Sequence, residues 1–261
     1  MSGLTDKYKG KIVVVTGGSK GIGLACAKQF LAHEARVFIC SRSQANIDQA
    51  LIKLPGAIGF SADLSDENQA NDFVERISKE FGPIDVLVNS AGAAKRAPVA
   101  ELKPASWRAA MDAKFFSTIN VLDPVIKLMA VRGKGVIINI IGSGGRVASP
   151  THLAGGAANS ALMLATAGLG NAYASSGIRV VGINPGLTET GRVTEGMDAE
   201  ARFSGITVDE AIEKALQKIP IGRMAKPEEI ADLVLFLGSE KASYITGTTI
   251  NMDGAQYPVI L

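Results

Sequence analysis

Short runs of β-branched and aliphatic residues alternate along the chain with longer segments in which apolar residues recur at helical spacing. Several of the short runs are apolar throughout, which is typical of strands covered on both faces. The pattern predicts seven strands, at Ile12–Val15, Val37–Cys40, Ile58–Ser61, Val86–Asn89, Val136–Ile140, Arg179–Ile183 and Thr248–Asn251. It predicts helices over Ile22–Ala32, Glu67–Phe81, Ala105–Ala130, Leu153–Ser175 and Pro227–Gly238.

This alternation of strands and helices predicts an α/β fold with a doubly wound parallel sheet and helices on both of its faces. A chain of 261 residues is near the size at which one hydrophobic core stops growing, so we expect a single domain over residues 1–261. The segment 187–219 has few strand signals and follows the end of a predicted strand. In such folds an insertion at this place usually covers the substrate.

The composition is that of a soluble globular protein, with 47% hydrophobic and 20% charged residues. A net charge of +2, carried by Lys and Arg spread along the chain, argues against nucleic acid or membrane as a partner. The polar residues 1–11 lack the apolar run of a signal peptide, so we expect a cytoplasmic protein. Cys26 and Cys40 have no metal-ligand spacing and are expected to be buried thiols, with no bound metal.

A glycine-rich turn lies between the first predicted strand and the first predicted helix. It reads Thr16-Gly17-Gly18-Ser19-Lys20-Gly21-Ile22-Gly23. Glycine is needed where the backbone turns tightly, approaches a phosphate or packs a helix against a strand. The helix N-terminus then offers free N–H groups and a positive dipole end to a diphosphate. We therefore predict that the turn binds a dinucleotide, through Gly17, Ser19, Lys20, Gly21, Ile22 and Gly23.

The end of the second predicted strand indicates which dinucleotide is bound. An NAD site would place Asp or Glu here to bind the ribose hydroxyls, but the chain has Ser41 and Arg42. Arg42 can pair with a 2′-phosphate, and Lys20 in the first turn adds a second positive charge. The sequence thus favours NADP(H) over NAD(H), with Ser41 and Arg42 beside the 2′-phosphate.

Four further motifs follow: Asp63-Leu64, Asn89-Ser90-Ala91-Gly92, Pro185-Gly186-Leu187-Thr188, and Ile245-Thr246-Gly247 through Asp253-Gly254. Together with the glycine-rich turn they resemble the short-chain dehydrogenase/reductase family over nearly the whole chain. The resemblance implies a Rossmann-type sheet of about seven parallel strands. It also implies a small-molecule substrate and assembly into a homodimer or homotetramer.

The resemblance also assigns cofactor contacts to these motifs. Asp63 and Leu64 are implied to contact the adenine. Asn89, Ala91 and Gly92 are implied to support the central sheet beside the cofactor. Pro185, Gly186 and Thr188 are implied to lie over the nicotinamide, with Thr188 at its carboxamide.

The catalytic residues of the family are missing from their usual positions. Its reductases use a Tyr-x-x-x-Lys pair, an upstream Ser and an Asn on the preceding long helix. With Ala161-Leu162 and Gly177-Ile178-Arg179-Val180 as anchors, the positions of the Tyr, the Lys and the Ser fall on Gly155, Asn159 and Gly142. A one-residue loop shift would restore the serine with Ser143, and Trp107 places the helical Asn at Lys114. The chain therefore resembles a divergent member without the Tyr and Lys. Tyr257, near the C-terminus, is a weak candidate to replace the Tyr.

Other groups nearby could carry the proton chemistry. His152 lies three residues before Gly155 and has an unperturbed pKa of about 6.5, which suits acid–base work. Lys114 could direct its ammonium into the space of the missing Lys, Ser143 could hydrogen-bond a carbonyl, and Asn159 could hold the nicotinamide ribose. Three of these residues also have a plainer interpretation: His152 as a surface histidine, Lys114 as a solvated or interface lysine, and Ser143 as a serine that caps its loop.

Three functions remain open at this point. The first is an NADP(H)-dependent oxidoreductase that acts on a carbonyl or alcohol with a non-standard proton donor. The second is a catalytically silent NADP(H)-binding sensor or scaffold, suggested by the loss of the Tyr and Lys. The third is a non-redox lyase or hydrolase that uses Lys114, Ser143 and His152 in the same pocket.

Overall fold

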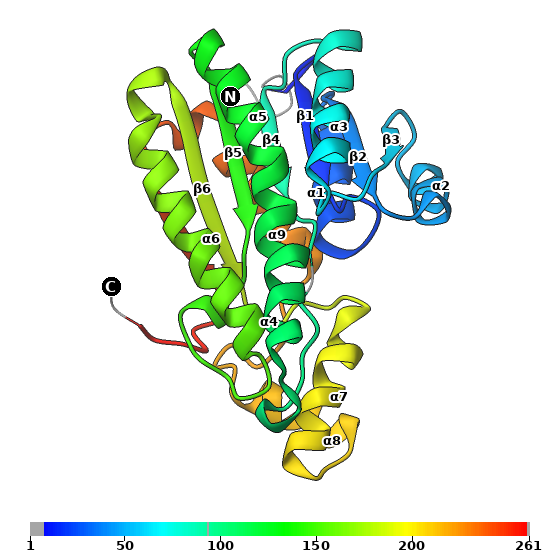
Figure 1. The fold of residues 1–261 in the computed structure, drawn as a ribbon, viewed down its shortest axis with the longest axis vertical. Coiled ribbons are helices and arrows are strands. Elements are labelled where there is room, and N and C mark those ends of the chain that lie inside the picture. Colours follow the sequence, from blue (N-terminus) through cyan, green and yellow to red (C-terminus); the bar gives the residue numbers. More distant parts are fainter. Residues whose placement is uncertain (1–7, 93, 260–261) are drawn as a thin grey trace.

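The centre of the molecule is a seven-stranded parallel sheet, in a computed structural model that describes residues 8–92 and 94–259 (Figure 1). The strand order is β3-β2-β1-β4-β5-β6-β7. The predicted α/β fold is thereby confirmed. The strands are β1 (Ile12–Thr16), β2 (Arg36–Ser41), β3 (Ile58–Ser61), β4 (Val86–Asn89), β5 (Gly135–Ile140), β6 (Ile178–Pro185) and β7 (Thr248–Met252).

The order of the strands reverses at β1, which pairs with β2 on one side and with β4 on the other. In open parallel sheets, ligands bind in the crevice beyond the carboxyl ends of the strands at such a reversal. Thr16 at the end of β1 is in register with Asn89, and Asn89 with Asn139. The polar ends of β1, β4 and β5 therefore lie in one row at the expected binding edge.

Helices cover both faces of the sheet (Figure 1). On one face α1 and α9 pack against each other, and on the other α3 packs against α5, with α6 along β6. At the lower end of Figure 1, α7 and α8 lie beyond the carboxyl ends of the strands. The helices are α1 (Gly21–Ala32), α2 (Gln44–Lys53), α3 (Glu67–Glu80), α4 (Pro104–Ala110), α5 (Ser117–Arg132), α6 (Leu153–Ala172), α7 (Arg192–Ser204), α8 (Val208–Gln217) and α9 (Pro227–Leu237).

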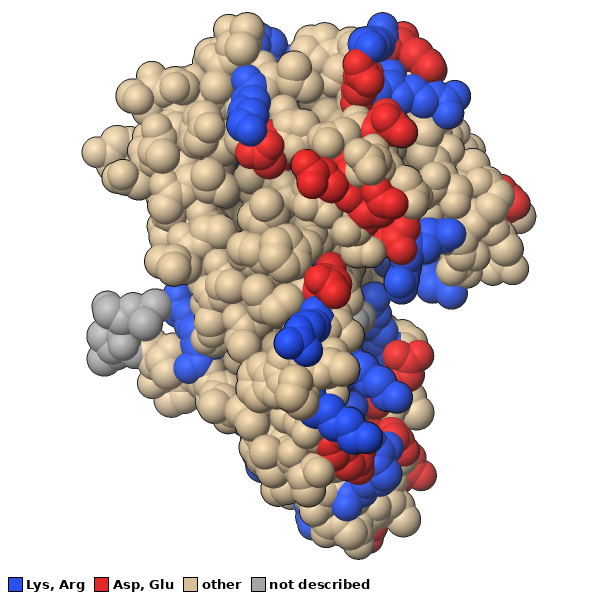
Figure 2. Space-filling view, in the orientation of Figure 1, with Lys and Arg blue, Asp and Glu red and all other residues tan. Residues whose placement is uncertain are grey.

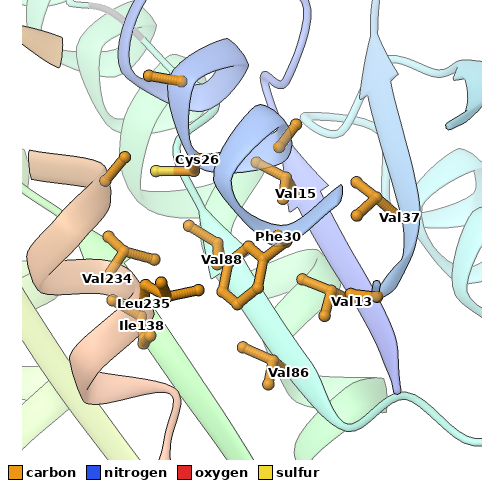
Figure 3. Close-up of a cluster of buried hydrophobic side chains, with 14 of the residues drawn as sticks. Val13, Val15, Cys26, Phe30, Val37, Val86, Val88, Ile138, Val234 and Leu235 are labelled. Atoms are coloured by element: carbon orange, nitrogen blue, oxygen red, sulfur yellow. The ribbon is translucent and has the colours of Figure 1, made fainter. Parts of the chain in front are cut away.

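Successive side chains of a strand point to opposite sides of the sheet, and helices cover both sides. Each central strand therefore buries side chains on both of its faces. Val13 and Val15 of β1 pack with Phe30 of α1 and Val234 of α9, as Figure 3 shows. The intervening Val14 belongs to a second cluster, with residues of α3 and α5. The apolar strands of the sequence are thus explained by two cores, one on each face.

The long helix expected over Ala105–Ala130 is not continuous α-helix. A π-helical turn, Met111–Phe116, separates α4 from α5. The hydroxyls of Ser117 and Thr118 donate to the carbonyl oxygens of Ala113 and Lys114, at 2.8 and 2.9 Å. Such turns are frequent at functional sites, and hydrophobic spacing alone does not reveal them.

Three helices lie outside the elements predicted from spacing. Helix α2 begins after Ser43, whose hydroxyl accepts from the backbone N–H of Asn46. The expected insertion at 187–219 contains α7 and α8, which share a small apolar cluster. Thr207 and Glu210 form a reciprocal cap at the start of α8. Among the described residues, no helix is long and apolar enough to cross a membrane.

Candidate active site

The turn after β1 can be built only with glycine at two of its positions. Gly17 has a φ of +65°, and a Cβ on it would lie 2.8 Å from backbone atoms of Ala91. A Cβ on Gly23 would lie 2.4 Å from the carbonyl oxygen of Gly17. The hydroxyl of Thr16 accepts from the backbone N–H groups of Ser90 and Ala91, both at 3.1 Å. The turn is therefore locked against the end of β4.

The N-terminus of α1 is open for an anion. The helix begins at Gly21, the side chain of Lys20 does not cap it, and its first turn carries no acidic residue. Its first N–H groups and its positive dipole end can therefore bind a diphosphate. Ser19 and Ile22 are half-buried in the same turn, and Lys20 is exposed beside it.

The end of β2 forms the neighbouring part of the site. Ser41 is half-buried and Arg42 is exposed, as a residue that meets a bound phosphate should be. The carboxylate of Asp63 accepts from the hydroxyl and N–H of Ser65, and these bonds lower its pKa, with a smaller contribution from Arg42. Leu64 is buried. This part of the site thus combines the buried Leu64 with two exposed cations, Lys20 and Arg42.

A buried hydrogen-bond chain joins the middle of the sheet to α6. The side-chain amide of Asn89 donates to Asn139, and that of Asn139 donates to Thr166, both at 2.9 Å. Gly92, a little further along, has a φ of +104°, and a Cβ there would lie 2.4 Å from the carbonyl oxygen of Ala113. This close approach places the π-helical turn against the end of β4.

The segment after β6 lies over the same edge of the sheet. Pro185 is in register with Met252, and the N–H of Gly186 donates to the carbonyl of Met252 at 2.9 Å. A Cβ on Gly186 would lie 2.9 Å from the Cα of Asp253. Thr188 is buried, and its hydroxyl donates to the carbonyl of Gly186 at 3.2 Å.

His152 occupies the space that a side chain at position 155 would enter. A Cβ on Gly155 would lie 2.2 Å from Cε1 and 2.8 Å from Nδ1 of the imidazole. On the other side, a Cβ on Gly144 would lie 2.7 Å from its Cδ2. The ring therefore lies between Gly144 and Gly155, in space that a side chain at either position would enter. His152 is not a surface histidine.

The surroundings of the His152 imidazole disfavour its protonated form. Its Nδ1 is buried and has no hydrogen-bond partner among the described residues. Burial lowers its pKa to about 4, and the positive charges of Arg96 and Lys114 add to this effect. At neutral pH the ring is therefore uncharged and can accept a proton.

Lys114 reaches the same region from the π-helical turn. Its ammonium donates to the carbonyl oxygen of Ile141, just beyond β5, at 2.6 Å. Burial lowers its pKa to about 8, and Arg192 adds repulsion. Arg192 of α7 itself donates to the carbonyl of Gly92 at 3.1 Å. Lys114 is thus a half-buried cation that is held by a backbone carbonyl.

Asn159 of α6 is almost fully buried. Its Nδ2 donates to the carbonyl of Gly142 at 3.3 Å, next to the carbonyl of Ile141 that accepts from Lys114. Its Oδ1 is buried without a partner among the described residues. Lys114 and Asn159 therefore donate to consecutive carbonyl groups just beyond the end of β5.

Ser143 lies close to the site, but its proton is already engaged. It is buried, and its hydroxyl donates to the carbonyl of Pro185 at 3.0 Å. A hydroxyl has one proton, so this bond ties the loop after β5 to the segment after β6. Gly142, which precedes Ser143, has a φ of +123°, where a side chain would be strained.

Of the four tyrosines, three lie away from His152 in the described structure. The hydroxyl of buried Tyr8 donates to the carbonyl of Leu235, and Tyr244 is fully exposed. Tyr173 follows the far end of α6, whose first turn holds Gly155. Tyr257 is half-buried, with Arg96 as the nearby charge that lowers its pKa.

Sequence reasoning missed the pocket that holds the imidazole. Gly144 and Gly155 make room for His152, and the positive charges of Arg96 and Lys114 act on it. The pairs Gly144-Gly145 and Gly155-Gly156 were the available signal, since two glycine pairs indicate a close approach. The described residues contain no group of three potential metal ligands.

Comparison with known proteins gives consistent results. A family model described as Enoyl-(Acyl carrier protein) reductase matches residues 17–255. A 3-oxoacyl-(acyl-carrier-protein) reductase, FabG, of Thermotoga maritima is 32% identical over 253 residues, which are 95% of this chain and 98% of that protein. A 3alpha-hydroxysteroid dehydrogenase of Mediterraneibacter gnavus is also 32% identical, over 95% of this chain and 97% of its own.

Solved structures agree with this. A variant of actinorhodin polyketide ketoreductase, crystallised with NADPH, has a TM-score of 0.92 and 27% identity, and the match covers 99% of this chain and 100% of that one. The chain belongs to the short-chain dehydrogenase/reductase family. The match to the family model, over residues 17–255, includes the glycine-rich turn from Gly17 onward and the sheet motifs.

Proposed function

We propose that the protein is an NADP(H)-dependent oxidoreductase that interconverts a carbonyl compound and its alcohol, with His152 in place of the family's tyrosine. One observation carries the proposal. The imidazole fills the space next to Gly155, and its buried Nδ1 lacks a partner among the described residues. A buried polar group without a partner is uncommon and is typical of a site that completes itself with a ligand.

The residues that would hold the cofactor fit it. The glycine turn leaves no room for side chains where the diphosphate would lie, and Arg42 and Lys20 are free to meet a 2′-phosphate. The unpartnered Oδ1 of Asn159 can accept from a ribose hydroxyl. When bound, the nicotinamide supplies or accepts the hydride, and the protein contributes orientation and electrostatics. The NADPH in the similar ketoreductase supports this choice.

His152 moves the proton in this proposal. In alcohol oxidation its neutral imidazole accepts the hydroxyl proton. In carbonyl reduction the imidazolium returns it to the oxygen, and because the pKa of the ring is about 4, this direction is favoured by acidic pH. The imidazole lies at the beginning of the space that a tyrosine at position 155 would fill. The proton therefore passes between the ring and the substrate through one water molecule. The ammonium of Lys114, held by Ile141, supplies a fixed positive charge that stabilises a developing oxyanion.

Assembly and substrate cover complete the proposal. Three apolar side chains of α5 and α6 are exposed: Leu128 at 50%, Val131 at 92% and Leu164 at 77% of their full accessibility. Figure 2 shows few charged side chains over α6. We infer that this face joins copies into a homodimer or homotetramer. Leu164→Glu would then lower the mass measured by light scattering. Helices α7 and α8 cover the bound substrate.

The experiment that tests the function measures loss of NADPH absorbance with a panel of carbonyl compounds, and its gain from NADP⁺ with alcohols. We expect turnover by the wild type and a loss on the order of 100-fold or more in His152→Gln, the usual size of an acid–base contribution. His33→Gln is the matched control, because it removes the other histidine, which contacts the carbonyl of Gln29. NADPH binding without turnover of any compound would contradict the proposal and favour a sensor.

A further inference from the structure

The loop that follows β4 brings an arginine to the substrate side of His152. Ala94, on this loop, has its Cβ 2.8 Å from the position of a Cβ on Gly155. Two residues later, Arg96 packs its Cδ and Nε against α7, each 3.4 Å from the position of a Cβ on Gly196. Next to it, the N–H of Ala97 donates to the carbonyl of Thr151 at 3.1 Å. Arg96 therefore lies between α7 and the residues that hold His152.

The guanidinium of Arg96 has no partner among the described residues, neither a hydrogen-bond acceptor nor a carboxylate at ion-pair distance. It is half-buried. Other partly buried arginines donate to backbone carbonyls: Arg132 to Ile84, Arg146 to Thr249 and Arg179 to Leu237. A guanidinium has five donors and stays charged, so a half-buried one without acceptors among the described residues is suited to an anion that is not part of the chain.

The acidic and phenolic groups around Arg96 leave it free. The carboxylate of Glu200 on α7 accepts from the hydroxyl of Thr151 at 2.9 Å, which directs it toward the loop before α6. Tyr257 borders Arg96 as a half-buried phenol, and burial raises its pKa, so it stays uncharged at neutral pH. The two charges that reach His152 most strongly, Arg96 and Lys114, are both positive. The region thus has an excess of positive charge where the substrate would lie.

We propose that Arg96 binds a carboxylate of the substrate, so that the protein acts on oxo acids and hydroxy acids. This inference rests on the proposed carbonyl–alcohol chemistry at His152. The planar fork of a guanidinium matches a carboxylate with two parallel hydrogen bonds, which fixes the position of the substrate as well as its charge. With the carboxylate on Arg96, the carbonyl carbon is directed toward His152, because one loop connects Ala94 at Gly155 to Arg96.

The test compares short linear oxo acids with their methyl esters, which keep the carbonyl and lose the charge. Binding is measured by calorimetry on the protein loaded with NADP⁺, which cannot reduce them, and turnover is measured separately with NADPH. We expect the wild type to bind the best acid roughly 10- to 100-fold more tightly than its ester, the usual range for charged hydrogen bonds. Arg96→Gln should reduce this ratio to near one, and Arg96→Lys should keep part of it.

Lys95→Gln is the matched control, because it removes the neighbouring, exposed charge and should leave the ratio unchanged. Equal binding of acid and ester by the wild type, or a ratio that survives in Arg96→Gln, would overturn the carboxylate site. The proposed function is tested independently. If acids bind through Arg96 but no compound is reduced, the site stands and the oxidoreductase fails. If acids and esters are reduced equally well, the oxidoreductase stands and the site fails.

Discussion

The two ends of the site differ in what holds them together. At the cofactor end, a Cβ on Gly17 or Gly23 would meet backbone atoms of the segment after β4 and of the turn itself, at 2.8 and 2.4 Å. At the proton-transfer end, the tight contacts run between side chains and glycines: the ring of His152 lies against Gly144 and Gly155. The first end is therefore held by backbone packing and the second by the packing of a side chain.

The contrast shows which parts of such a site can change. A side chain at Gly23 would have to displace the turn, whereas the loss of a side chain at Gly155 leaves a space that another side chain can fill. Lys114 and Asn159 likewise donate to consecutive carbonyls just beyond the end of β5. Charge and hydrogen bonding can thus be supplied from another position, but the path of the backbone cannot.

The strongest test of the cofactor end is Gly23→Ala. Because the new methyl group would lie 2.4 Å from the carbonyl oxygen of Gly17, the turn must open. We expect NADPH affinity to fall on the order of 1,000-fold, together with a loss of stability at the upper end for overpacking. Titration of NADPH fluorescence measures the affinity. Gly168→Ala is the control, as its new Cβ meets no atom within 4 Å; similar affinities of the two variants would disprove the rigidity of the turn.

The lowered pKa of His152 should make the free energy of unfolding depend on pH. The pKa of His152 is lowered from 6.5 to about 4 in the folded protein, so between these values the unfolded chain binds more protons. The contribution is fully present above about pH 6.5 and is lost as the pH falls to about 4, an amount on the order of 3 kcal/mol.

Urea unfolding of the wild type and of His152→Gln, at pH 7 and at pH 4, measures this contribution. The wild type should lose more stability than the variant on acidification. His33→Gln controls for the loss of an imidazole as such. Parallel losses in the wild type and in His152→Gln would show that His152 is not held uncharged by its surroundings.

Gly155→Ala tests whether the glycine exists to make room for the imidazole. Its methyl group would overlap Cε1 of His152, so we expect a loss of about 2 kcal/mol in stability and a large fall in turnover, with NADPH binding retained. In a His152→Ala background the same change should cost clearly less, because only Ala94 remains in contact. The cycle of four proteins is measured by chemical denaturation. Additive losses would contradict a shared space.

The smallest expected effect is at the 2′-phosphate. Arg42→Gln removes an exposed charge, so we expect NADPH to bind roughly tenfold more weakly and NADH to be unaffected, the lower end for a charged hydrogen bond. Arg36→Gln, at the other end of β2, is the matched control. The ratio of the two dissociation constants is the measurement, and a fall that is equal for NADPH and NADH would assign Arg42 another role.

The order of strands and helices and the glycine-rich turn could be predicted from the amino-acid sequence. The loss of the family's Tyr and Lys, inferred from the same sequence, stays a prediction. These features are local: strands buried on both faces appear as apolar runs, and a phosphate turn appears as glycines between a strand and a helix. It also indicated Lys114, His152 and Asn159 as neighbours of the gap, although their roles stay predictions.

Which side chains occupy the space next to Gly155 could be known only from the three-dimensional packing. The π-helical turn that directs Lys114 to Ile141, the ring of His152 between Gly144 and Gly155, and Arg96 against α7 all depend on contacts between segments far apart in the chain. The engaged proton of Ser143 likewise depends on Pro185, forty-two residues away. Hydrophobic spacing reports which face of an element is buried, but the partner of a polar group is set by packing in three dimensions.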